Sequence, residues 1–145
     1  MFGLFKKKRS FDDTQKAKFV RAISDMLEIQ KMVVSKCSIE DGEGCLNRKA
    51  IGYVYGFIDA ALQSIGHDMS DISIGIPITY QVLDSLFPGR ANEYTQFLMD
   101  HMGEDPEVTL GAQTGGQQYI EFTKPGTQGA PMGFARFMLE GTKDQ

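Results

Sequence analysis

Residues 47 to 66, NRKAIGYVYGFIDAALQSIG, decide the fold of this chain. Asn47 is a favoured helix N-cap, and Gly66 favours the left-handed conformation that ends a helix. Between them apolar residues recur at the three- and four-residue spacing of an amphipathic helix. These residues are Ile51, Val54, Tyr55, Ile58, Leu62 and Ile65. We predict a helix over residues 47–65, which is too short in its apolar part for the roughly 20 residues that span a bilayer.

A second stripe of the same predicted helix consists of small residues. Gly52, Gly56 and Ala60 follow one another at four-residue spacing. A glycine inside a helix costs about 1 kcal/mol relative to alanine. Two glycines on one stripe therefore indicate that another backbone approaches closely there, and we predict packing against a neighbouring helix.

Three other segments have helical patterns with recognisable ends. An amphipathic pattern begins after the candidate caps Asp12, Asp13 and Thr14 and predicts a helix over residues 13–36. Shorter patterns predict helices over residues 91–102 and 131–140.

Two segments are ambiguous. From residue 67 to residue 77 isoleucines alternate with small or polar residues, but Gly75 and Pro77 interrupt the pattern. We expect an extended connector there, with Pro77 opening a short helix that ends at Phe87. Residues 105–122 begin with an N-cap, Asp105, and their apolar and small residues recur at helical spacing. Glycines at 111, 115 and 116 weaken that helix, so a hairpin near residues 108–122 stays open as an alternative.

Together these patterns predict an all-α protein. We expect a compact bundle of five to six helices with close, glycine-mediated helix packing, and an α+β fold with a C-terminal hairpin as the alternative. Residues 1–10 are expected to form a flexible basic and apolar tail, and residues 11–145 a single helical domain.

The tail differs in charge from the rest of the chain. The whole chain has 15 Lys plus Arg and 19 Asp plus Glu, and without the four tail cations the remainder has a formal charge of −8. Such a tail is either a solvated end or an arm that docks weakly on an anionic membrane or a partner protein. Nucleic acid is not an expected partner, because an acidic body repels phosphate. The tail residues concerned are Phe2, Leu4, Phe5, Lys6, Lys7, Lys8 and Arg9.

No catalytic or cofactor signature is present. The glycine spacing of residues 111–116 is that of a phosphate-binding loop, but Gln117 stands where lysine is required. Cys37 and Cys45 are too few for a secreted disulfide scaffold, and no apolar signal region follows the basic run. We therefore expect no cofactor and a cytoplasmic location, with peripheral membrane contact if the tail docks on lipid.

The two histidines stand in acidic surroundings and give the one enzymatic hypothesis. His67 stands near Asp68 and Asp71 in sequence, and His101 lies in another acidic stretch. If the fold brought both clusters together, His67, Asp68, Asp71 and His101 could hold a divalent ion in a metal-assisted hydrolase. The alternative is that both histidines lie at helix C-termini, where a cation suits the helix dipole.

An acidic stretch gives the preferred hypothesis. Residues 91–110 contain five carboxylates and no lysine or arginine, a surface that suits a basic protein partner. The carboxylates are Glu93, Asp100, Glu104, Asp105 and Glu107. We predict a non-enzymatic protein-binding or regulatory accessory domain whose partner is a protein with a basic surface.

Overall fold

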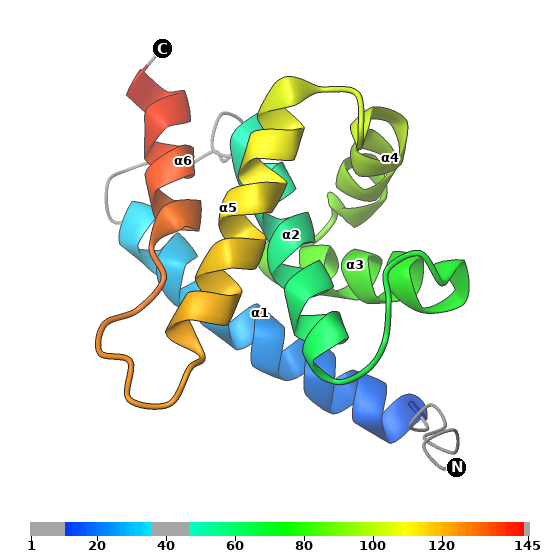
Figure 1. Cartoon of the computed structure of the whole chain (residues 1–145). Coiled ribbons are helices and arrows are strands. Elements are labelled where there is room, and N and C mark those ends of the chain that lie inside the picture. Colours follow the sequence, from blue (N-terminus) through cyan, green and yellow to red (C-terminus); the bar gives the residue numbers. More distant parts are fainter. Residues whose placement is uncertain (1–10, 36–46, 144–145) are drawn as a thin grey trace.

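A computed structural model of the chain describes residues 11–35 and 47–143, and within these ranges it contains six helices and no strand (Figure 1). The prediction of an all-α fold with five to six helices is confirmed. The alternative of a hairpin near residues 108–122 is wrong, because these residues lie in one helix. The helices are α1 (Asp13–Ser35), α2 (Arg48–Ser64), α3 (Ile72–Leu86), α4 (Ala91–His101), α5 (Pro106–Phe122) and α6 (Gly133–Lys143).

Helix α2 is the centre of the bundle. It lies among the other helices and contacts each of the five (Figure 1). It also contributes more buried hydrophobic residues to the core than any other helix. Tyr53 and Phe57 of α2 are fully buried, and so is Phe134 of α6. The ring of Tyr53 stacks on both phenylalanines, with centroids 5.7 Å and 5.9 Å away. Offset aromatic stacking of this kind adds to the free energy gained by burying the rings.

Helices α2 and α5 pack backbone against backbone. A Cβ atom placed on Gly52 or Gly56 would overlap a carbonyl oxygen of α5, and one placed on Gly111 or Gly115 would overlap a carbonyl oxygen of α2. The predicted close approach of a neighbouring helix is thus confirmed, and the neighbour is α5. The glycines that weaken the helical propensity of α5 are the residues that permit this contact.

Helix α3 corrects the expectation for residues 67–77. We expected an extended connector up to Pro77, but α3 begins at Ile72 and contains Pro77 in its interior. The side chain of Asp71 accepts a hydrogen bond from the backbone N–H of Ser73 and so caps the helix at 3.1 Å. Gly75 permits the preceding loop to lie close, since a Cβ there would come within 2.5 Å of the carbonyl oxygen of Met69. This cap acts together with the burial of Ile78, Val82, Leu83 and Leu86 in the core, and the two offset the helix-breaking preference of Pro77.

The predicted helix caps lie where the sequence places them. Asn47 accepts a hydrogen bond from the N–H of Ala50 at 2.8 Å. Asp12 and Gln15 form a reciprocal capping box, in which each side chain accepts from the other residue's N–H. Gly66 adopts the expected left-handed conformation, with φ of +88°.

Helix α6 is held by side chains of other helices. The Oε1 atom of Gln30, a buried residue of α1, accepts a hydrogen bond from the N–H of Phe134 at 2.9 Å. Gln118 of α5 accepts from the N–H of Gly133 at 2.9 Å and from the hydroxyl of Tyr53 at 2.7 Å. The first N–H groups of a helix lack partners within the helix. The side-chain oxygens of Gln30 and Gln118 accept from two such groups of α6 and so act as its N-cap.

No helix in residues 11–35 and 47–143 is long and apolar enough to cross a membrane. The tail predicted over residues 1–10 and the two cysteines, Cys37 and Cys45, lie outside the described residues.

Candidate binding surfaces

The two histidines are both engaged with aromatic rings. His67 is buried and stacks on Phe11, with ring centroids 4.5 Å apart. His101, in the last turn of α4, stacks on Phe97 at 4.1 Å, and its Nδ1–H donates to the carbonyl oxygen of Phe97. In the described part of the chain no three His, Cys, Asp or Glu side chains come together in a way that could hold a metal ion. The hypothesis that the histidine clusters meet therefore has no geometric support.

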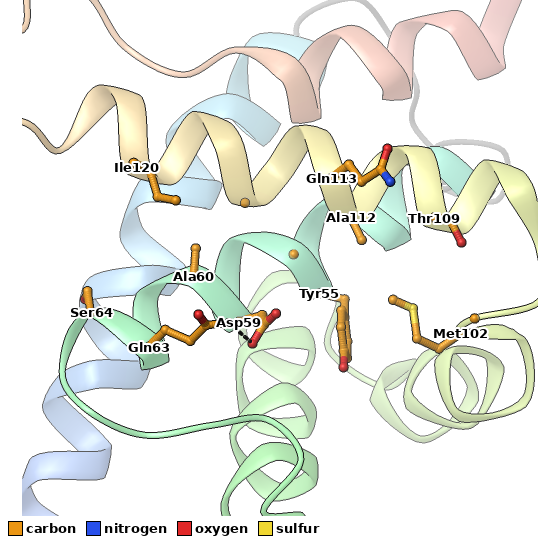
Figure 2. A pocket seen from close by; sticks show the side chains of 13 residues that line it. Tyr55, Asp59, Ala60, Gln63, Ser64, Met102, Thr109, Ala112, Gln113 and Ile120 are labelled. Carbon is orange, nitrogen blue, oxygen red and sulfur yellow. Dashed lines mark hydrogen bonds between the residues drawn. The ribbon is translucent and has the colours of Figure 1, made fainter.

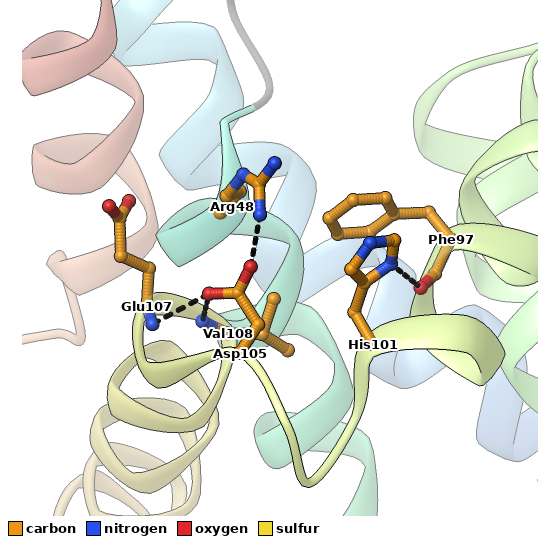
Figure 3. A network of polar contacts seen from close by, with 6 residues as sticks. All are labelled: Arg48, Phe97, His101, Asp105, Glu107 and Val108. Carbon is orange, nitrogen blue, oxygen red and sulfur yellow. Dashed lines mark hydrogen bonds and ion pairs between the residues drawn. The ribbon is translucent and has the colours of Figure 1, made fainter.

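A polar network joins the start of α2 to the start of α5 (Figure 3). Asp105 caps α5 by accepting hydrogen bonds from the N–H groups of Glu107, at 2.8 Å, and Val108, at 3.3 Å. Its second carboxylate oxygen pairs with the guanidinium of Arg48. The same guanidinium lies 5.7 Å from the ring centre of Phe97. Arg48 thus links α2, α4 and α5 at one end of the molecule.

Two carboxyl groups that pair with arginines, those of Glu93 and Asp105, have lowered pKa values. Arg90 holds the carboxylate of Glu93 through two nitrogens, at 2.8 Å and 3.1 Å, and this hydrogen bonding lowers the pKa of Glu93. Desolvation acts to raise the pKa of Asp105, but hydrogen bonds from Glu107 and Arg48 outweigh it, and the pKa is lowered. Two of the five predicted carboxylates are therefore already paired with cations of this chain.

A cleft of about 760 Å³ gathers three of the five predicted carboxylates beside aromatic rings. We call it the acidic cleft and define it by Glu93, Asp100 and Glu107 together with Tyr94, Phe97 and His101, and Arg48 and Arg90 also line it. Asp100 and Glu107 are exposed, and in the described chain neither forms an ion pair. The fifth predicted residue, Glu104, is exposed in the turn after α4 and is not part of the cleft wall.

A second hollow follows the contact between α2 and α5. This open groove has a volume of about 640 Å³, and Figure 2 shows the side chains that line it. Small residues such as Gly56, Ala60 and Ala112 line it and leave this space unfilled. Asp59 accepts a hydrogen bond from Nε2 of Gln63 at 3.0 Å. Ile120, at the α5 side, is 55% exposed, so the groove has an apolar rim.

Tyr55 is an aromatic residue with a polar hydroxyl in the wall of this groove. It is half-buried, although the spacing of apolar residues places it on the core face of α2. Burial raises the pKa of its phenol, and the negative charges of Asp59 and Asp68 raise it further. Tyr55 therefore stays protonated well above neutral pH and can donate a hydrogen bond at the surface.

The sequence finds some of these residues and misses others. The acidic stretch of residues 91–110 is visible in the sequence, but the fold adds Arg48 from a distant helix, which no local pattern can show. Of the groove residues, Tyr55 has the spacing of a core residue and Ile120 lies outside the predicted apolar stripe of its helix. The excess of apolar positions over what a helix of this bundle can bury is the available signal for them.

No protein-family model, curated protein or solved structure matches this chain. The candidate surfaces are therefore assessed by their own geometry and charge.

Proposed function

We propose that this protein is a non-enzymatic binding module that receives a basic segment of another protein in the acidic cleft. The single observation that carries the proposal is that the exposed carboxylates Asp100 and Glu107 line one cleft together with the aromatic rings of Tyr94 and Phe97. Carboxylates beside aromatic faces suit lysine and arginine, because the ring face and the carboxylate both attract a cation.

The arginines of this chain illustrate how the cleft holds a cation. Arg90 is bound by the carboxylate of Glu93, and its guanidinium lies 4.8 Å from the ring centre of Tyr94. Arg48 combines a carboxylate with the ring of Phe97 in the same way. A cation from a partner would find the remaining carboxylates, those of Asp100 and Glu107, in the wall of the same cleft.

The charge of the chain supports a basic partner. Residues 10–145 carry a formal charge of −8, which would steer a basic protein toward the surface and raise its association rate. The role that follows is that of an accessory or regulatory protein, and we expect it to act in the cytoplasm. The membrane-docking role of the tail rests on sequence alone and is tested separately below.

A defined probe tests the cleft. A fluorescein-labelled peptide of alternating lysine and leucine should bind the protein, whereas a glutamate–leucine peptide of the same length should not. Raising the salt so that the Debye length falls from about 10 Å to about 3 Å should weaken binding steeply. The double variant Asp100→Asn/Glu107→Gln should weaken it about three- to tenfold, the range for two exposed ion pairs.

A matched control separates the cleft from net charge. Asp25→Asn/Glu121→Gln removes the same two charges from exposed positions on α1 and at the far end of α5. This control should bind the lysine–leucine peptide almost as well as the unaltered protein. If both double variants lose the same affinity, binding follows net charge and the acidic cleft is not the site.

A further inference from the structure

A third hollow, of about 280 Å³, lies between α3 and α4. We call it the α3–α4 cavity. Tyr55 and Met102 line both this cavity and the groove of Figure 2, so the two adjoin. The other walls are mainly apolar side chains of the two helices and of the loop before α3: Met69, Ile76, Leu98 and Met99. Small-molecule sites are typically concave and mostly apolar, with volumes from about 300 Å³ upward, so this cavity suits a ligand at the small end of that range.

Two threonine hydroxyls in the cavity wall lack hydrogen bonds. Thr79 of α3 is 3% exposed and Thr95 of α4 is 8% exposed, and among the described residues neither hydroxyl has a partner. Helical threonines commonly donate to the carbonyl four residues earlier. Thr114 and Thr123 of this chain do so, at 3.0 Å and 2.6 Å. The two cavity threonines do not, although a buried polar group without a hydrogen bond is destabilising.

The chemistry of the walls restricts the ligand. No lysine, arginine, aspartate, glutamate or histidine lines the cavity, so a charged ligand would be desolvated without compensation. Each threonine hydroxyl can both donate and accept, and rotation about χ1 exchanges its position with that of the methyl group. Three of the eight methionines of the chain, Met69, Met99 and Met102, form the walls, and methionine adapts its shape to what it contacts.

We propose that the α3–α4 cavity binds a small uncharged amphiphile, with its apolar part against the methionines and its hydroxyl or carbonyl group on Thr79 and Thr95. The site is independent of the acidic cleft, which lies on other faces of α4 and involves neither threonine. Ile72 and Met99, which are 67% and 54% exposed, flank the opening and extend its apolar contact.

Methyl NMR of the full chain tests the site directly. With ¹³C-labelled methionine methyl groups, titration with 1-hexanol should shift the signals of Met69, Met99 and Met102 in a saturable manner. The signal of Met138, buried elsewhere in the core, should not move. The probe 1-chlorohexane has the same length but no hydroxyl and is itself more hydrophobic, so the ratio of the two affinities in the unaltered protein is the reference for the variants below. Hexanoate, which is charged, should not bind.

Isosteric variants test whether the threonine hydroxyls determine this ratio. Thr79→Val/Thr95→Val should shift the ratio of affinities toward 1-chlorohexane by about fivefold or more, the value of a single hydrogen bond. Its melting temperature should be equal to or above that of the unaltered protein, because two unpaired buried hydroxyls are removed. Thr79→Ser retains the hydroxyl and should keep the ratio of the unaltered protein. Thr114→Val, which removes a satisfied hydroxyl on α5, is the control and should not change binding.

Three results would overturn the proposal. Methionine shifts that rise linearly without saturation would mean only non-specific partitioning, and an affinity ratio that is unchanged in Thr79→Val/Thr95→Val would exclude a role for the hydroxyls. If hexanol had no effect while the lysine–leucine peptide shifted Met69 and Met99, the cavity would instead receive a side chain of the protein partner. Loss of peptide binding at the acidic cleft would leave the first two outcomes unaffected.

Discussion

Gly115 and Gly116 are neighbours on α5, yet their environments differ. A Cβ on Gly115 would overlap the carbonyl oxygen of Tyr53, whereas one on Gly116 would meet its nearest atom, the carbonyl oxygen of Gly56, at 3.4 Å. Gly115→Ala should therefore destabilise the protein by about 1–3 kcal/mol or more, the usual effect of overpacking. Gly116→Ala should be neutral or stabilising by up to about 1 kcal/mol, from helix propensity alone. Urea unfolding measures both, and equal losses of stability would refute the backbone contact.

Tyr53 predicts how stability depends on alkaline pH. Burial raises its pKa to about 12, although a hydrogen bond with Gln30 and the charge of Arg136 act in the opposite direction. Between about pH 10 and 12 the unfolded chain loses the phenolic proton while the folded protein keeps it. The free energy of unfolding should therefore be undiminished below pH 10 and fall, by on the order of 3 kcal/mol, as the pH rises to 12.

The variant Tyr53→Phe isolates that contribution. It loses the hydrogen bond to Gln118 and should start less stable by about 1 kcal/mol. Its stability should then fall less between pH 10 and 12 than that of the unaltered protein, as measured by urea unfolding at several pH values. Parallel pH profiles for the two proteins would show that Tyr53 ionises equally in the folded and unfolded states.

At the scale of elements, α3 contains a proline that destabilises the helix. Pro77 lies in the helix interior, where proline lacks the N–H that the preceding turn requires, and its side chain is exposed. Pro77→Ala should stabilise the protein by about 1–2 kcal/mol after allowing for the greater freedom of the unfolded chain. Pro106 lies at the first position of α5, where proline is tolerated, so Pro106→Ala should have little effect. Thermal unfolding compares the two, and an unchanged or lower melting temperature for Pro77→Ala would contradict the argument.

Helices α3 and α5 also show how far the sequence predicts this structure. Strong caps such as Asn47 and Asp105 act within three residues, so the sequence predicts the starts of α2 and α5. Asp71 is equally local, but the alternating isoleucines and Pro77 obscure it. The hairpin alternative arose because glycine has low helix propensity, and only the tertiary contact with α2 explains its presence in α5.

The candidate sites likewise include one that the sequence predicts and one that only the fold reveals. The carboxylates of the acidic cleft are close in sequence and could be predicted. The α3–α4 cavity could not, because Thr79 and Thr95 meet only when two helices pack, and their missing hydrogen bonds depend on rotamers. The separation of the two histidines could not be predicted either, because it depends on how the same helices pack.

At the scale of the whole molecule, residues 1–10 are predicted to be dispensable for folding. The six described helices already share one buried core, so deletion of these residues should leave the melting temperature nearly unchanged. If they form a docking arm, the intact protein should bind anionic vesicles weakly in a sedimentation assay. The truncated protein should not bind, and neither should a variant with Lys6, Lys7, Lys8 and Arg9 replaced by glutamine. Equal sedimentation of all three would mean that the tail does not contact membranes.

The backbone contact between α2 and α5 has a consequence for recognising related proteins. Side chains in a core can exchange among leucine, isoleucine and methionine while the fold persists. A contact made by carbonyl groups and glycines has no such substitutes, because every other residue adds a Cβ where an oxygen lies. Distant relatives would therefore keep two glycine pairs of four-residue spacing, equivalent to Gly52/Gly56 and Gly111/Gly115, on two helices joined by a long connection. That spacing should outlast any similarity in the apolar residues around it.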